Sequence, residues 1–185
     1  MLVPHRPPHR RWAWILAVCI ALGGMLAIHQ HELRNLSWTQ LDSWIGRQFP
    51  DVASISTTQL SADLESARSA SGTRWMLLDV RTTQEFAVSH LPGARHVEVD
   101  KVLDFAEKEL GKLDRSQPIL VYCSVGIRSA AAARDLQLAG FTQVKNLRGS
   151  IFQWANAGRA LEGGNLVHPY NALWGQLLRV DLRSQ

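Results

Sequence analysis

Cysteine is scarce in this chain: among its 185 residues there are only two, Cys19 and Cys123. Cys19 lies inside a long uncharged run near the N-terminus, where it cannot easily reach a folded domain. A disulfide framework is therefore excluded. A lone cysteine after an apolar stretch is ordinarily a small core residue, so the surroundings of Cys123 must decide between that role and chemistry.

Clusters of metal ligands and of basic residues are missing as well. The seven histidines fall mostly in flanking segments, and no pair of cysteines or histidines has convincing metal-ligand spacing, so we expect neither a metal nor another cofactor. The net charge is +4, but the basic residues are scattered and no basic stripe alternates with aromatic residues. We therefore expect no nucleic-acid partner.

One long uncharged run does occur, from Trp12 to Ile28. Its seventeen residues are at the short end of the roughly 17 to 25 that span a bilayer as a helix, and they exceed a typical signal-peptide core. The basic residues just before the run are Arg6, Arg10 and Arg11. The positive-inside rule then predicts a single-pass anchor with a cytoplasmic N-terminus and the rest of the chain on the outer, periplasm-like side.

A cleaved signal peptide is the alternative to this anchor. Ala21 and Gly23 are small residues at the two positions that a signal peptidase recognises, so the domain would then be secreted. We favour the uncleaved anchor, because the apolar run continues past that position.

The pattern of residues divides the chain into four segments. They are a basic leader with the anchor (1–30), an amphipathic connecting helix or linker (31–51), a main domain (52–162) and a C-terminal extension (163–185). The connecting helix is predicted from apolar residues at helical spacing, ended by Pro50. In the extension, Trp174, Leu177, Leu178 and Val180 predict a short helix that packs on the domain or on the connecting helix.

Short apolar runs alternate with helical patterns throughout the main domain. We expect strands at 54–56, 75–80, 96–99, 118–122 and 143–147, and helices at 57–69, 82–90, 100–110, 129–139 and 151–157. Thr57 or Thr58 is the expected cap of the first helix. This alternation predicts an α/β fold with a largely parallel central sheet and helices on both faces.

Cys123 stands where such a sheet binds ligands, directly after the strand PILVY and before an alanine-rich helix. Backbone N–H groups at the start of that helix favour a thiolate over a thiol. Gly126 lets the backbone turn tightly, and Ser129 is the expected helix cap. Arg128 is the only cation of the loop and would attract an anionic substrate. A core cysteine needs none of these features.

Five motifs in order resemble the single-domain rhodanese family of sulfurtransferases. They are LDVR (78–81), EF (85–86), SHLPGA (89–94), YCSVGIRS (122–129) and LRGSIFQWANAG (147–158). The resemblance covers roughly residues 52–162 and implies the rhodanese fold. It implies that Cys123 forms a persulfide, that Arg128 binds an anionic donor, and that the remaining loop residues surround the sulfur. Those residues are Ser124, Val125, Gly126, Ile127 and Ser129.

Charged residues at the end of the preceding strand are predicted to support the fold rather than to react. Asp79 would steady the active loop through backbone N–H groups, and Arg81 would pair with Glu85 across one helical turn. His90 is expected to be a hydrogen-bonded residue under the Pro-Gly turn, and Trp154 a core aromatic.

Two other functions remain open. Cysteine phosphatases have a similar loop, but it holds one residue more between cysteine and arginine and is preceded by histidine, whereas this chain has Tyr122. A non-turnover sulfur carrier, sensor or interaction module would have the same loop as an enzyme. The expected partner is a small anionic sulfur donor or a protein persulfide, and any sulfur must leave to an outside nucleophile because the domain has no second cysteine.

Overall fold

The computed structural model describes residues 38–68, 73–110 and 114–185, and residues 40–185 form one compact unit. Within these ranges no helix combines the length and the apolar character needed to cross a membrane. The predicted anchor at 12–28 lies outside the described residues. Helical residues 38–48 end just before Pro50, as the sequence predicts.

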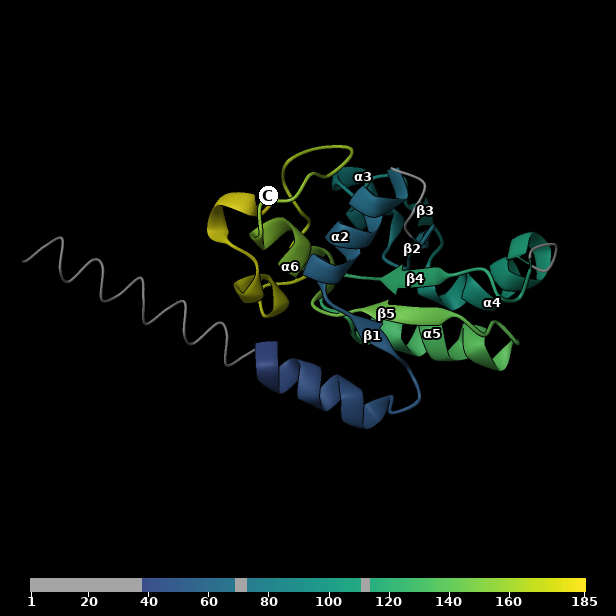
Figure 1. The fold of residues 1–185 in the computed structure, drawn as a ribbon. Helices are drawn as coiled ribbons and strands as arrows, with labels where there is room; N and C mark the ends of the chain where they lie inside the picture. Colours follow the sequence, from purple (N-terminus) through teal and green to yellow (C-terminus); the bar gives the residue numbers. More distant parts are fainter. Residues whose placement is uncertain (1–37, 69–72, 111–113) are drawn as a thin grey trace, which may run out of the picture. The chain divides into compact units, whose positions relative to one another are not determined.

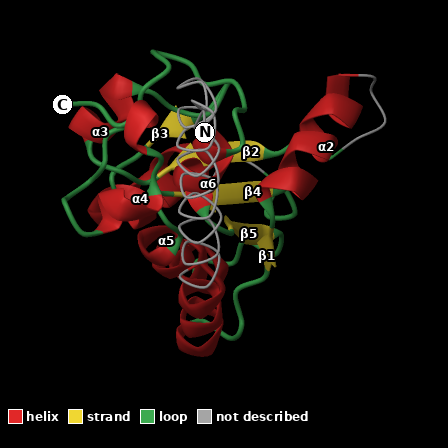
Figure 2. Ribbon diagram, turned by 90° about the vertical axis from the view of Figure 1, so that its left-hand side faces the viewer, coloured by secondary structure: helices red, strands yellow, loops and turns green. Residues whose placement is uncertain are grey.

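Five parallel strands form the central sheet, and their order is β1-β5-β4-β2-β3 (Figure 2). They are β1 (Ser54–Ile55), β2 (Met76–Asp79), β3 (Arg95–His96), β4 (Ile119–Tyr122) and β5 (Val144–Leu147). All four residues of β4 are buried, which fits the central strand of a sheet covered on both faces. The expected parallel α/β architecture is confirmed.

Helices cover both faces of this sheet (Figure 1). The α-helices after the first strand are α2 (Thr57–Arg68), α3 (Thr83–Val88), α4 (Val102–Phe105), α5 (Ile127–Leu138) and α6 (Ser150–Asn156). Ala132, Ala133 and Leu136 of α5 pack with α4 and with one face of the sheet in a single apolar core. The small alanine side chains let α5 approach the sheet closely, which places its N-terminus beside the end of β4.

Three details differ from the sequence prediction. The third strand was expected at 96–99, but β3 ends at His96, because β2, its one neighbour among the described strands, ends at the paired Asp79. The helix expected at 100–110 is a 3₁₀ turn (Val99–Lys101), the short α4 and a π-helical turn (Ala106–Leu110). The N-cap of α2 is Ser56, whose hydroxyl accepts the N–H of Gln59. The prediction that Thr57 or Thr58 caps this helix is therefore wrong.

The C-terminal extension packs on α6 through a short 3₁₀ helix (Trp174–Leu177), followed by another (Val180–Leu182). The side-chain amide of Asn156 donates to the Leu177 carbonyl at 2.8 Å and its oxygen accepts the N–H of Arg179 at 2.9 Å. Leu178 is fully buried, whereas Val180 is exposed. The predicted helix is thus present, and it packs against the main domain.

Candidate functional site

Cys123 directly follows β4 and begins the loop that leads into α5. Its side chain is 1% exposed and is a free thiol. The N–H of Gly126 donates to Sγ at 3.2 Å. Gly126 has φ +112°, a conformation that residues with a Cβ rarely adopt, so glycine is required for the turn that points this N–H at the sulfur.

The surroundings of Sγ stabilise its ionised form. Burial alone would raise the pKa of the Cys123 thiol, but the charge of Arg128, the hydroxyl and N–H of Ser129 and the N–H of Gly126 outweigh it and lower this pKa below its ordinary value. The sulfur therefore lies at a helix N-terminus and near a guanidinium, the two features that activate a cysteine.

Arg128 is held by Glu85, the buried glutamate of α3. Nη1 and Nη2 of Arg128 donate to the two carboxylate oxygens of Glu85 at 2.9 and 2.8 Å, and Nη2 also donates to the Ser124 hydroxyl at 2.9 Å. The Ser124 hydroxyl in turn donates to Glu85 at 2.7 Å. The expected pairing of Glu85 with Arg81 is wrong, because Glu85 turns toward the loop. Both terminal nitrogens of Arg128 are therefore engaged by Glu85 and Ser124.

Ser129 does not cap α5, contrary to the prediction, because the helix begins at Ile127 and its cap position is Gly126. The Ser129 hydroxyl lies 3.5 Å from Sγ and 2.7 Å from Oδ1 of Asn146. The hydroxyl has one proton and can donate it to either acceptor, Sγ or the Asn146 oxygen. The amide of Asn146 also donates to the Gly126 carbonyl at 3.1 Å, so it ties β5 to the turn at Gly126 and to the first turn of α5.

The start of α6 supports the loop from the other side. The Ser150 hydroxyl accepts the N–H of Cys123 at 3.1 Å, while the N–H groups of Ile151 and Phe152 donate to the carbonyls of Cys123 and Ser124. These bonds fix the backbone of the reactive residue. Val125 is buried and Ile127 is half-buried. That these two side chains surround the sulfur stays a prediction.

Asp79 and Arg81 form a buried pair at the carboxyl end of β2. Nη2 of Arg81 donates to Asp79 at 2.6 Å and to the Ser89 carbonyl at 2.6 Å, and both side chains are fully buried. Asp79 also accepts the N–H of Arg81 at 3.1 Å. The prediction that Asp79 steadies the active loop is therefore wrong, because its hydrogen bonds stabilise the turn after β2. This pair joins the end of β2 to the segment after α3.

Two predicted structural roles are confirmed. Nδ1 of His90 lies 3.1 Å from the Phe86 carbonyl, and its ring stacks on that of Phe86. Trp154 is 4% exposed, and its indole N–H donates to the Ala160 carbonyl at 2.8 Å. Both side chains are accounted for by packing and hydrogen bonding.

Sequence reasoning missed four residues of the site: Glu85 as the partner of Arg128, then Asn146, Ser150 and Tyr170. The Tyr170 ring lies over the Arg128 guanidinium, with 4.5 Å from Cζ to the ring centre. Glu85 and Ser150 lie within the quoted motifs, and Asn146 directly precedes one of them. A polar residue beside an apolar, buried run is unusual, and this could have marked all three as candidates for the site. Tyr170 stands in the extension, and no local pattern indicated its contact.

Comparison with known proteins gives a consistent result. A family model described as a rhodanese-like domain matches residues 56–157. Thiosulfate sulfurtransferase 16, chloroplastic, of Arabidopsis thaliana is 39% identical over 89 residues, covering 44% of this chain and 74% of that protein. The probable adenylyltransferase/sulfurtransferase MoeZ of Mycobacterium tuberculosis is 35% identical over 85 residues. That match covers 46% of this chain and 21% of MoeZ, so the chain spans about a fifth of that relative.

A solved structure agrees with these sequence matches. The crystal structure of a thiosulfate sulfurtransferase from Pseudomonas aeruginosa has a TM-score of 0.54 and 25% identity, over 67% of this chain and 22% of that one. The range matched by the family model includes the Cys123 loop, its partner Glu85 and the supporting start of α6. The chain therefore belongs to the rhodanese-like domain family.

Proposed function

We propose that this protein is a sulfurtransferase in which Cys123 takes one sulfur from a donor and passes it to an outside nucleophile. The observation that supports this most directly is the N–H of Gly126 on Sγ, together with the lowered pKa of the thiol. The sulfurtransferase relatives, at modest identity, support the same conclusion.

The transfer needs two displacement steps at sulfur. The Cys123 thiolate attacks the outer sulfur of the donor, a new S–S bond forms, and the donor's own bond to that sulfur breaks, with the electron pair leaving on the donor remainder. For thiosulfate this remainder is sulfite. A thiolate acceptor then attacks the outer sulfur of the persulfide, and Cys123 leaves as the thiolate. The two steps balance without an added oxidant or reductant.

The donor is proposed to be a small anion such as thiosulfate, or a protein persulfide. The only formal cation of the loop is Arg128, and its charge acts on Sγ while its two terminal nitrogens are occupied by Glu85 and Ser124. The acceptor must come from outside, because the only other cysteine is Cys19 in the uncharged run.

A turnover assay tests this function. The protein is mixed with thiosulfate and cyanide, and sulfite and thiocyanate are measured. We expect both products from the unaltered protein and neither from Cys123→Ser. A sulfur carrier would load once without turnover, and hydrolysis of p-nitrophenyl phosphate with no sulfur transfer would instead support the phosphatase alternative.

We further propose that residues 12–28 anchor the protein in a membrane, with the domain on the outer side. The support is the uncharged run and the three arginines that precede it. Secretion after cleavage of this segment is the alternative. The same loop would in either case work in a compartment that oxidises thiols.

A further inference from the structure

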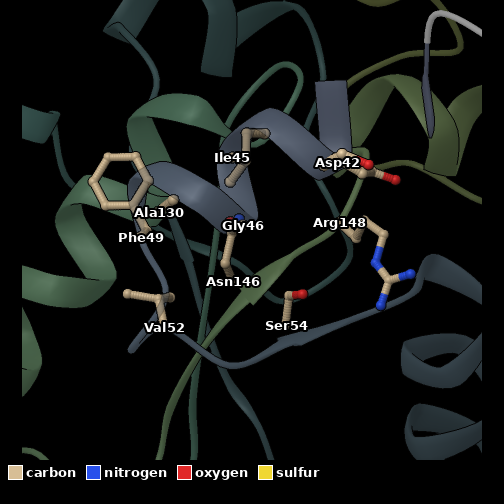
Figure 3. A pocket seen from close by; sticks show the side chains of 10 residues that line it. Asp42, Ile45, Gly46, Phe49, Val52, Ser54, Ala130, Asn146 and Arg148 are labelled. Atoms are coloured by element: carbon tan, nitrogen blue, oxygen red, sulfur yellow. The ribbon is translucent and has the colours of Figure 1, made fainter. Parts of the chain in front are cut away.

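A cavity lies behind the active loop, between helical residues 40–48 and the edge of the sheet formed by β1 and β5 (Figure 3). Its volume is about 300 Å³, at the lower end of the roughly 300 to 1,000 Å³ of small-molecule sites. Asn146 lines it, and the same side chain holds the Gly126 carbonyl on the loop. The cavity is thus separate from the sulfur but adjoins the turn around it.

One side of this cavity has two opposite charges that are not paired with each other. Asp42 extends from the helix and Arg148 from the end of β5, and Figure 3 shows both on the same side of the cavity. Oδ1 of Asp42 is buried and has no hydrogen-bond partner among the described residues. The guanidinium of Arg148 likewise makes no hydrogen bond or ion pair in the described part of the chain.

A buried carboxylate oxygen without a partner is costly, so its retention beside a cavity needs an explanation. Burial raises the pKa of Asp42 to about 6, and the positive charge of Arg148 opposes this shift. Asp42 is therefore predominantly ionised at neutral pH. The charge of Arg148 acts on the Asp42 carboxylate, but no ion pair joins the two side chains.

The opposite side of the cavity is apolar. Phe49 and Val52 line it there, and Ile45 and Ala130 contribute further apolar surface (Figure 3). A ligand that fits this arrangement has a positive and a negative group at one end and a short apolar group at the other.

We propose that this cavity binds a free α-amino acid with an apolar side chain. The α-ammonium group pairs with Oδ1 of Asp42, the α-carboxylate pairs with the guanidinium of Arg148, and the side chain packs against Phe49 and Val52. A zwitterion satisfies both charges at once, whereas a simple cation or anion satisfies one. The inference goes beyond the sulfur chemistry and does not depend on it.

Titration calorimetry on the full-length protein with L-leucine tests the proposal, because leucine does not react with thiols. We expect saturable binding. Asp42→Asn and Arg148→Gln should each weaken it by about tenfold or more, as expected for loss of one charge-assisted hydrogen bond. The matched controls are Asp51→Asn and Arg47→Gln, exposed residues next to the cavity that do not line it, and they should bind leucine as the unaltered protein does.

Ligand analogues test the same point without altering the protein, and they decide the matter if a variant fails to fold. N-acetyl-L-leucine lacks the ammonium group, L-leucinamide lacks the carboxylate, and glycine lacks the side chain. Weaker binding of all three than of L-leucine supports the proposal. Absence of saturable leucine binding, or equal binding of leucine and its N-acetyl derivative, overturns it. Leucine binding that both charge variants retain in full also overturns it.

Discussion

Arg128 donates from both terminal nitrogens to the two carboxylate oxygens of Glu85, at 2.9 and 2.8 Å. The Glu85 side chain is 2% exposed and that of Arg128 22%, so this bidentate pair is largely shielded from water. It connects the first turn of α3 to the first turn of α5 across 43 positions of sequence. The pair fixes the guanidinium beside the reactive cysteine, and its loss has consequences that can be measured.

Glu85→Gln should destabilise the fold by about 2–3 kcal/mol, because it leaves a partly buried guanidinium without its counter-charge. The free energy of unfolding in urea measures this loss. Glu65→Gln is the control, since Glu65 pairs with Arg68 at an exposed position and its replacement should leave stability essentially unchanged. Equal stability of the two variants would contradict a structural role for the Arg128 pair.

The same pair predicts how stability depends on acid. Burial alone would raise the pKa of Glu85, but Arg128, Ser124 and the N–H of Thr82 lower it to about 2, below its ordinary value of 4.5. The unfolded chain then takes up the proton first, so this stabilisation is complete above about pH 4.5 and is lost as the pH falls toward 2. Glu85→Gln should flatten the decline in that window, and an unchanged decline would show that other carboxylates cause it.

Arg128→Gln should raise the pKa of the Cys123 thiol, because the charge of Arg128 is the largest of the influences that lower it. The pH dependence of alkylation by iodoacetamide measures this shift, and sulfur transfer at neutral pH should fall by about tenfold. Arg134→Gln, on the same helix but not among the groups that act on Cys123, should leave the midpoint where it is. If the midpoint of alkylation were the same in both variants, Arg128 would have no part in lowering the pKa of the thiol.

Gly126→Ala should lower both stability and sulfur transfer. Alanine at φ +112° is strained by about 1–3 kcal/mol, and its Cβ would lie 3.3 Å from Cδ1 of Ile45. The turn must then shift and move its N–H away from Sγ. Gly140→Ala is the matched control, since Gly140 also has a positive φ of +94° but a Cβ there meets nothing within 4 Å. The control should lose stability while it keeps sulfur transfer, and loss of transfer in both would refute a specific role for the turn at Gly126.

The parallel sheet and the position of Cys123 could be predicted from sequence, for definite physical reasons. Strands buried on both faces appear as uninterrupted apolar runs, such as the one that ends at Tyr122. Glycine at a positive φ and an alanine-rich helix directly after a cysteine are local features, and local features can be read along the chain. The strand after Ala94 was predicted too long, because its end depends on where its neighbour β2 stops.

The pairing of charged side chains could not be predicted in the same way. Arg81 and Glu85 stand at a spacing that suits a helical ion pair, yet each has a partner elsewhere, Asp79 for one and Arg128 for the other. Several acceptors compete for each guanidinium, and the backbone positions decide among them. The contact of Tyr170 with Arg128 depends on how the C-terminal extension packs, which no local pattern encodes.

The proposed orientation in the membrane makes a separate prediction. A reporter active only outside the cytoplasm, fused after Gln185, should work, and one active only in the cytoplasm should be silent. Replacing Arg6, Arg10 and Arg11 by neutral residues should weaken this preference, since the cationic excess sets the orientation. Activity of the cytoplasmic reporter in the unaltered protein would place the domain on the reducing side instead.

The central claim is that Cys123 itself holds the transferred sulfur, and intact mass spectrometry tests it most directly. The protein is incubated with thiosulfate, freed of excess donor and weighed before and after treatment with a thiol reductant. We expect a gain of one sulfur atom that the reductant removes, and no gain in Cys123→Ser under the same conditions. A reducible gain of one sulfur in the serine variant, or none in the unaltered protein with either thiosulfate or a persulfide donor, would contradict it.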